Sequence, residues 1–234
     1  MNYVIWNNKD SRDIKGLLIS ELPPITRPKM RVKETVIDGV DGSIIEEIGY
    51  ESYDKPMVIG LKIGADIDEI SEFFSGSGEV VFSNEPDKYY KATISNRIDF
   101  QRLLRYRVAQ VTFRVQPFKY NRVEVPREAL GTERNNLLVE NIGNHTAKPI
   151  ITLTGSGEVQ IFLDGQYVFD YVFPEDEDTV VIDCEKQDAY NDNPNNLKNR
   201  NMGGDFPILK KGSTNIHWSG WLDSIRIEKY SRWL

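Results

Sequence analysis

Nucleophiles and imidazoles are scarce in this chain of 234 residues. The cysteine Cys184 stands alone, and the histidines are His145 and His217. An internal disulfide, a cysteine zinc site and a His-rich metal cluster are therefore excluded. A Ser-His-Asp triad would need one of the two histidines, and neither has a nucleophile-elbow pattern nearby. Cys184 follows Asp183 and lacks the electropositive surroundings of a reactive thiolate. We expect no catalytic residues and no cofactor or metal site.

A repeated glycine motif and the abundant carboxylates could also carry chemistry. Gly-Ser-Gly-Glu-Val occurs at residues 76–80 and again at 155–159, but a phosphate loop needs a strand before it, a helix after it and a lysine. Both copies instead lead into predicted strands, and neither carries the lysine. The acidic run at 175–178 lacks the spaced oxygens and central glycine of an EF-hand loop. Because glycosidase carboxylate pairs are defined in space, a hydrolase with an unrecognised pair stays an alternative.

The elements that would position these residues are mainly β-strands. Residues 109–115 alternate apolar and polar side chains, which is the pattern of a half-buried strand. Asp164-Gly165 separates two short apolar runs, which predicts a hairpin. One helix is predicted at about 66–75, with Asp66 as its N-cap and Gly76 as its left-handed C-terminal residue. Its Ile67, Ile70 and Phe74 share one face, which we expect to pack on a sheet.

A second hairpin is predicted at about residues 27–53, with its turn at 38–42. On its first strand, Arg27, Lys29, Arg31 and Lys33 alternate with Pro28, Met30 and Val32, which would place four cations on one face. Such a face is typical of a solvated strand or of an edge protected by charge. Our sharper hypothesis is that these four cations form a contact with a neighbouring subunit.

Charge and hydropathy divide the chain and exclude several classes of protein. The net charge of −7 lies entirely in residues 128–234, since residues 1–127 are neutral overall. This shift indicates two domains, residues 1–128 and 129–234. An acidic chain is a poor nucleic-acid binder. Because no apolar run exceeds four residues, we expect no membrane span and no signal peptide.

Several segments, taken in order, resemble the distal tail protein family of long-tailed, non-contractile (siphovirus-type) bacteriophages and prophages of Gram-positive bacteria. The matching segments are FFSGSGEVVFSNEPDKYYKA (73–92), VTFRVQPFKY (111–120), NIGN (141–144), KPII (148–151), GSG (155–157), ID (182–183), AY (189–190), GDFP (204–207), Gly212 and NI (215–216). Where relatives often have a Trp-Leu pair at the end of the helix, this chain has Phe73-Phe74, a volume-tolerant change.

The resemblance implies a mainly β fold of two antiparallel β-sandwich domains. The first, ring-forming and similar to the tail-tube fold, would carry the helix and a projecting β-hairpin, and the second would be a galectin-like or jelly-roll sandwich that faces outward. It also implies a non-enzymatic baseplate hub at the virion tail tip: a homohexameric ring that joins the tail tube to the host-adhesion apparatus and lets DNA pass. The implied partners are the tail tube, tape-measure, tail-associated tip and receptor-binding proteins, with assembly in the cytoplasm of the host bacterium.

A carbohydrate-binding β-sandwich protein that contacts the host cell wall is the second interpretation. Its support is a group of aromatic residues in the acidic half, namely Trp218, Trp221, Tyr167, Tyr171 and Tyr190, which could stack on sugars. Trp218 and Trp221 are three apart, so on a strand they lie on opposite faces, and we expect at least one of them in the core.

Overall fold

The structure, a computed structural model, describes residues 1–39, 41–94, 96, 98, 104–131, 135–191 and 193–234. The chain divides into two compact units, residues 1–122 together with Leu234, and residues 123–233. The boundary predicted from the charge shift, between residues 128 and 129, falls inside the first strand of the second unit, β10 (Arg127–Leu130). Each unit is described by itself.

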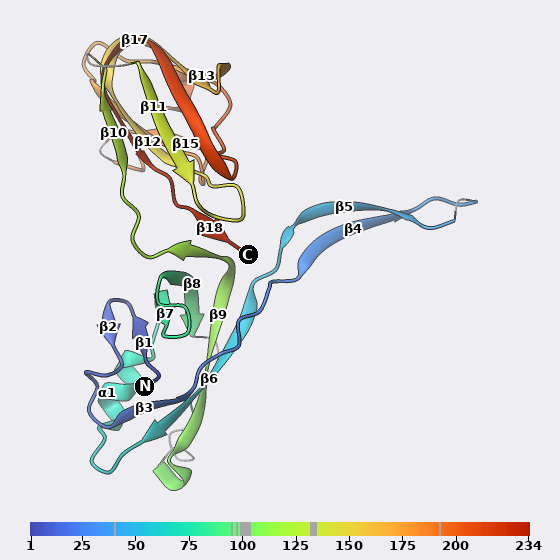
Figure 1. Cartoon of the computed structure of the whole chain (residues 1–234), viewed down its shortest axis with the longest axis vertical. Coiled ribbons are helices and arrows are strands. Elements are labelled where there is room, and N and C mark those ends of the chain that lie inside the picture. Colours follow the sequence, from blue (N-terminus) through green and yellow to red (C-terminus); the bar gives the residue numbers. More distant parts are fainter. Residues whose placement is uncertain (40, 95, 97, 99–103, 132–134, 192) are drawn as a thin grey trace. The chain divides into compact units, whose positions relative to one another are not determined.

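The N-terminal unit is built on one curled antiparallel sheet (Figure 1). Its strands are β1 (Val4–Trp6), β2 (Lys9–Asp10), β3 (Leu17–Glu21), β6 (Tyr53–Leu61), β7 (Ser77–Phe82), β8 (Lys88–Ile94) and β9 (Val108–Asn121). They lie in the order β2-β1-β7-β8-β9-β6-β3. Phe113 of β9 is fully buried, and its ring contacts those of Trp6 and Phe82 at centroid distances of 5.3 and 5.5 Å. Aromatic edge-to-face packing therefore closes this core.

The predicted helix is confirmed as α1 (Ile67–Phe73), slightly shorter than expected. Asp66 caps it, because its carboxylate accepts hydrogen bonds from the backbone N–H groups of Asp68 and Glu69 at 3.0 and 3.3 Å. Ile70 and Phe74 are buried in the core of the sheet. Gly76 has a φ of +79°, so the chain can turn from the helix into β7.

The C-terminal unit is a β-sandwich in which two long strands, β12 (Ile150–Leu163) and β17 (Gly212–Glu228), each contribute to both layers. Its other elements after β10 are β11 (Asn136–Asn141), β13 (Gln166–Val172), β14 (Thr179–Asp183), β15 (Asp188–Tyr190), the 3-10 helix η1 (Asn199–Asn201) and β16 (Met202–Gly204). The short strand β18 (Arg232–Trp233) follows β17 and is not part of this sheet. The first part of β12 pairs with β14 and the last part with β13. In the same way, β17 pairs first with β11 and then with β10.

The two long strands bend together at their glycines. Pairing between β12 and β17 shifts register around residues 154–159, which is the signature of β-bulges. A Cβ at Gly155 would lie 2.3 Å from the carbonyl oxygen of Trp221, and one at Gly220 would lie 2.1 Å from that of Glu158. The second Gly-Ser-Gly copy was predicted to lead into a strand; it instead lies inside β12, where small residues allow the sharp bend.

The predicted fold class, mainly β with β-sandwich architecture, is confirmed by these sheets. The predicted Asp-Gly hairpin is also confirmed: Leu163 pairs with Gln166, and Asp164 and Gly165 have φ values of +49° and +82°. Positive φ at both central residues is the type I′ geometry. Within the described residues, no helix is long and apolar enough to cross a membrane.

Candidate functional site

A two-stranded ribbon extends from the N-terminal unit and is the structure's counterpart of the predicted hairpin at 27–53. Strands β4 (Met30–Val36) and β5 (Ser43–Tyr50) pair with each other in antiparallel register. Among the described strands they have no other partner, so both edges of the ribbon are open. Figure 1 shows this ribbon in blue, beyond the sheet of its own unit. We call residues 27–39 and 41–53 the arm.

A β-bulge divides the arm into two parts. Arg31 pairs with Gly49 and Val32 pairs with Glu47, so Ile48 is the extra residue. Gly49 has a φ of +124°, and a Cβ there would lie 3.4 Å from Nη2 of Arg31. The backbone conformation, rather than the space around it, therefore requires glycine at this position. We call residues 27–31 and 49–53 the root of the arm, and residues 32–39 and 41–48 its tip.

Three of the four predicted contact residues lie in the root, and Lys33 lies at the start of the tip. Arg27 and Lys29 precede β4, whereas Arg31 and Lys33 lie on it. All four side chains are exposed. Lys33 faces Glu46 across the ribbon, with Nζ 3.9 Å from Oε2. Because both groups are well exposed, this pair is weak, but it means that Lys33 already has an acidic neighbour in its own arm.

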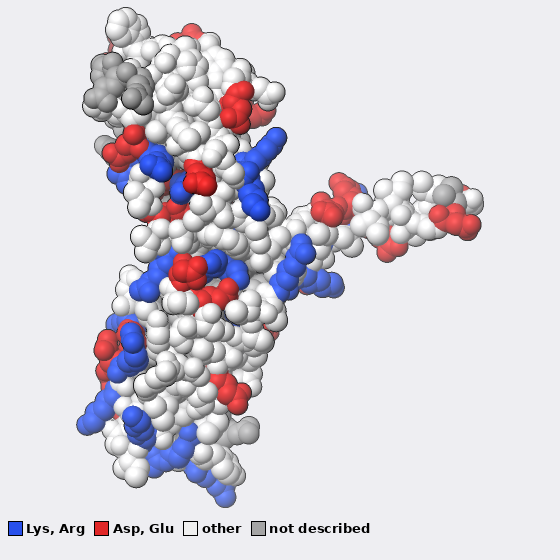
Figure 2. Space-filling view, in the orientation of Figure 1, with Lys and Arg blue, Asp and Glu red and all other residues white. Residues whose placement is uncertain are grey.

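The tip has a composition that the sequence prediction missed. Its exposed apolar side chains are Val32, Val36, Ile37, Ile44, Ile45 and Ile48, each between 46% and 70% exposed. Its acidic residues are Glu34, Asp38, Asp41, Glu46 and Glu47. Figure 2 shows basic side chains where the arm leaves the unit and acidic ones further out. The alternation of apolar residues is visible in the sequence. The structure adds that no described element covers them, so these side chains are exposed.

The segment that leads into the root, residues 23–26, is held to the sheet by side chains that donate to its backbone carbonyls. Asn84 Nδ2 donates to Pro23 O at 3.0 Å, and Lys55 Nζ donates to Pro24 O at 2.9 Å. Tyr53 donates its hydroxyl hydrogen to Thr26 O at 3.3 Å. On the other strand, the ring of Tyr50 packs edge-on against that of Phe118, with centroids 5.8 Å apart. Both ends of the arm are thus anchored.

Lys55 is the most unusual of these anchors because it is 2% exposed. Its ammonium lies 4.9 Å from the ring centroid of Tyr90 and 5.9 Å from that of Phe82, at cation–π distance. Burial lowers the pKa of Lys55 to about 8, against the attraction of nearby Glu85.

The polar groups next to Lys55 are arranged around the carboxylate of Glu85. Glu85 accepts hydrogen bonds from Lys119 and, at 2.7 Å, from the hydroxyl of Tyr90. Burial and this bond raise the pKa of Tyr90, and burial raises that of Tyr53 to about 12. These contacts position the segment of chain that leads into the arm.

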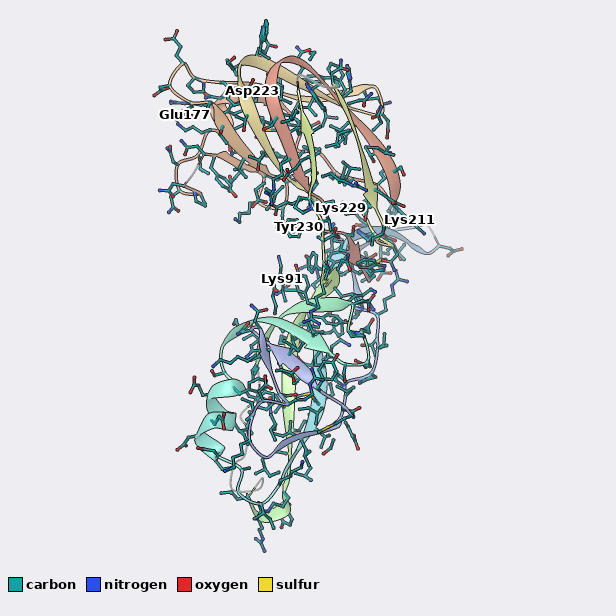
Figure 3. All side chains as sticks on the ribbon, turned by 60° about the vertical axis from the view of Figure 1, so that its left-hand side comes forward. Lys91, Glu177, Lys211, Asp223, Lys229 and Tyr230 are labelled. Carbon is teal, nitrogen blue, oxygen red and sulfur yellow. The ribbon has the colours of Figure 1, made fainter. Side chains whose placement is uncertain are left out.

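The C-terminal unit offers two surfaces that bear on carbohydrate binding. Trp218 is buried and Trp221 is 81% exposed, as the spacing of the two tryptophans predicted. A separate open pocket of about 710 Å³ is lined by charged residues that include Asp170, Arg200 and Glu177 (labelled in Figure 3). Phe173 is the aromatic residue among the described lining and is itself buried. The pocket therefore lacks an exposed ring on which a sugar could stack.

Residues with possible chemistry are dispersed. Cys184 is buried, and burial raises the pKa of its thiol, so the thiolate is disfavoured. The described part of the chain holds no group of three or more His, Cys, Asp or Glu side chains that could bind a metal ion.

This fold, with its two β units and open arm, is shared with a solved hub protein of a phage. The solved structure of Dit (gp19.1) from phage SPP1, described as a paradigm of the hub of the adsorption apparatus in phages infecting Gram-positive bacteria, superposes with a TM-score of 0.70. The match covers 98% of this chain and 99% of that chain at 15% sequence identity. The resemblance found in the sequence is thereby confirmed at the level of the fold.

A second solved structure, the activated baseplate of phage p2, matches over 98% of each chain with 9% identity and a TM-score of 0.46. No family model matches the chain, and no curated protein matches it by sequence.

Proposed function

We propose that this chain is a structural, non-enzymatic hub protein of a phage tail tip. Six copies would form a ring that joins the tail tube to the host-adhesion apparatus and lets DNA pass. The observation that supports this most is the fold shared with SPP1 Dit along nearly the whole chain. The N-terminal domain would build the ring, and the C-terminal domain would face outward toward the receptor-binding apparatus.

In this proposal the arm is an inter-subunit contact, and Arg27, Lys29, Arg31 and Lys33 take part in it. The support is physical. A two-stranded ribbon is at best marginally stable in water, and its open edges and exposed apolar side chains are features that free monomers avoid. An interface between subunits would cover both. The tail tube, tape-measure, tail-associated tip and receptor-binding proteins of the virion remain the proposed further partners.

Size-exclusion chromatography with light scattering tests the ring directly. We expect a particle of about 161 kDa, six copies of the 26.9 kDa chain, and annular particles in negative-stain images. A species of one chain mass at every concentration, together with turnover of cell-wall material, would instead favour a hydrolase and contradict the proposal.

The exposed Trp221 favours a second candidate function, carbohydrate binding by the C-terminal unit. If it is correct, purified Gram-positive cell-wall polysaccharide should quench the tryptophan fluorescence of the full-length protein, and Trp221→Ala should abolish the response. Trp218→Phe, which changes a buried ring, is the matched control. If the protein does not bind the polysaccharide, wild type, Trp221→Ala and Trp218→Phe should all show no saturable fluorescence quenching.

A further inference from the structure

The arm carries opposite charges at its two ends. Between residues 27 and 31 there are three basic residues and no acidic one, and Glu51 is the acidic residue of the other root strand. The tip has five acidic residues against Lys33. The bulge at Ile48 separates the basic root from the acidic tip, and Figure 2 shows this separation along the ribbon.

Arg27 and Lys29 lie far from the carboxylates at the tip of their own arm. Antiparallel pairing of β4 with β5 keeps the ribbon extended, and Lys29 and Arg27 precede Glu34 by five and seven residues, which is roughly 16 Å or more at about 3.3 Å per residue. Charges at that separation on an exposed ribbon are screened from each other at physiological ionic strength. The tip of another copy can bring carboxylates close to Arg27 and Lys29.

The tip also presents apolar surface that needs a cover. Cross-strand pairing places Val32 opposite Glu47, and Ile45 opposite Glu34, on one face. This face therefore mixes carboxylates with half-exposed apolar side chains. Its complement is a surface with long basic side chains, whose alkyl stems cover apolar groups while their charged ends meet carboxylates. Arg27 and Lys29, both exposed at the root, have this character.

We propose that copies of this chain associate head to tail, with the arm tip of one copy on the arm root of the next. Glu34 and Glu47 of one copy meet Arg27, Lys29 and Arg31 of the other, and the apolar face of the tip is covered in the contact. Such a contact joins two different patches, so it propagates from copy to copy and ends only when the ring closes. The inference rests on the proposed ring and names the contact that builds it.

Two charge-reversed proteins test the pairing. The tip variant is Glu34→Lys with Glu47→Lys, which leaves the Lys33–Glu46 pair intact, and the root variant is Arg27→Glu with Lys29→Glu. We expect each variant alone to be monomeric by light scattering, because positions 34 and 47 of the tip then carry the same charge as positions 27 and 29 of the root. An equimolar mixture should assemble again, since in each contact these positions then have opposite charges. The control is Lys15→Glu with Lys62→Glu, exposed residues of the same unit outside the arm, which should assemble as wild type does.

The outcomes separate the contact from the ring. Recovery in the mixture also shows that both variants are folded. If both variants assemble as wild type does, or if the mixture stays monomeric while wild type assembles, the pairing of tip with root is wrong and the ring stands. If wild-type protein is monomeric throughout, both the ring and this contact are wrong.

Discussion

At the level of single residues, the buried ammonium of Lys55 makes the stability of the N-terminal unit depend on pH. Its pKa is about 8 in the folded protein, whereas an unfolded lysine titrates near 10.4. Between these values the unfolded chain binds more protons than the folded one, so the free energy of unfolding rises with pH. Lys55→Met removes this titration. Between pH 7.5 and 9.5 we expect wild type to gain about 1–2 kcal/mol relative to the variant in urea denaturation.

The other groups near the Lys55 ammonium do not reverse this sign. They are Glu85, Lys119, Tyr53 and Tyr90, and burial raises the pKa of both tyrosines. An unfolded tyrosine ionises near pH 10, so the raised pKa values of the two tyrosines oppose the lysine effect, but this contribution is present in wild type and variant alike and cancels in their difference. Lys62→Met is the control, because Lys62 is exposed. Parallel stability curves for wild type and Lys55→Met would show that the ammonium is not buried in solution.

At the level of elements, the bend shared by β12 and β17 depends on glycine at one crowded position. Gly220 has a φ of +97°, and a Cβ there would lie 2.1 Å from the carbonyl oxygen of Glu158. Gly165 has a similar φ of +82° but open space around it. Gly165→Ala should therefore cost about 1–2 kcal/mol for backbone strain alone. Gly220→Ala should cost clearly more in the same chemical denaturation experiment, and equal costs would mean that the bend opens easily.

The same elements show what sequence reasoning could reach. Helix α1 and the hairpin at Asp164-Gly165 were predictable because their determinants are local: the Asp66 cap and two residues that tolerate positive φ. The continuity of β12 was not predictable from the sequence, because Gly155 packs against Trp221, far along the chain. The burial of Lys55 was not predictable either, because its partners Pro24 and Tyr90 come from other segments. The basic root was visible as an alternation, but an exposed apolar tip has the same pattern as a core strand.

At the level of the whole molecule, the proposed ring would have to let DNA pass without binding it. Affinity for phosphate comes from Lys and Arg that release counterions, and the chain has a net charge of −7. In the proposed head-to-tail contact the exposed basic residues Arg27, Lys29 and Arg31 would also be neutralised by the acidic tip. Wild-type protein should therefore not retard duplex DNA in a gel-shift experiment at about 0.1 M salt. At this ionic strength the attraction between basic proteins and DNA phosphates is only partly screened, so a basic surface would still be detected.

The tip variant, Glu34→Lys with Glu47→Lys, tests whether the acidic tip prevents the arm from binding DNA. It adds basic charge to the arm and leaves the root uncovered, so it should retard the same DNA, with an affinity that falls steeply as salt rises. The root variant Arg27→Glu with Lys29→Glu, equally unable to assemble by itself, should not. Retardation by both variants would mean that loss of assembly alone exposes a DNA-binding surface elsewhere. Retardation by the tip variant alone would locate the basic surface on the arm, where the acidic tip of the next copy covers it in the ring.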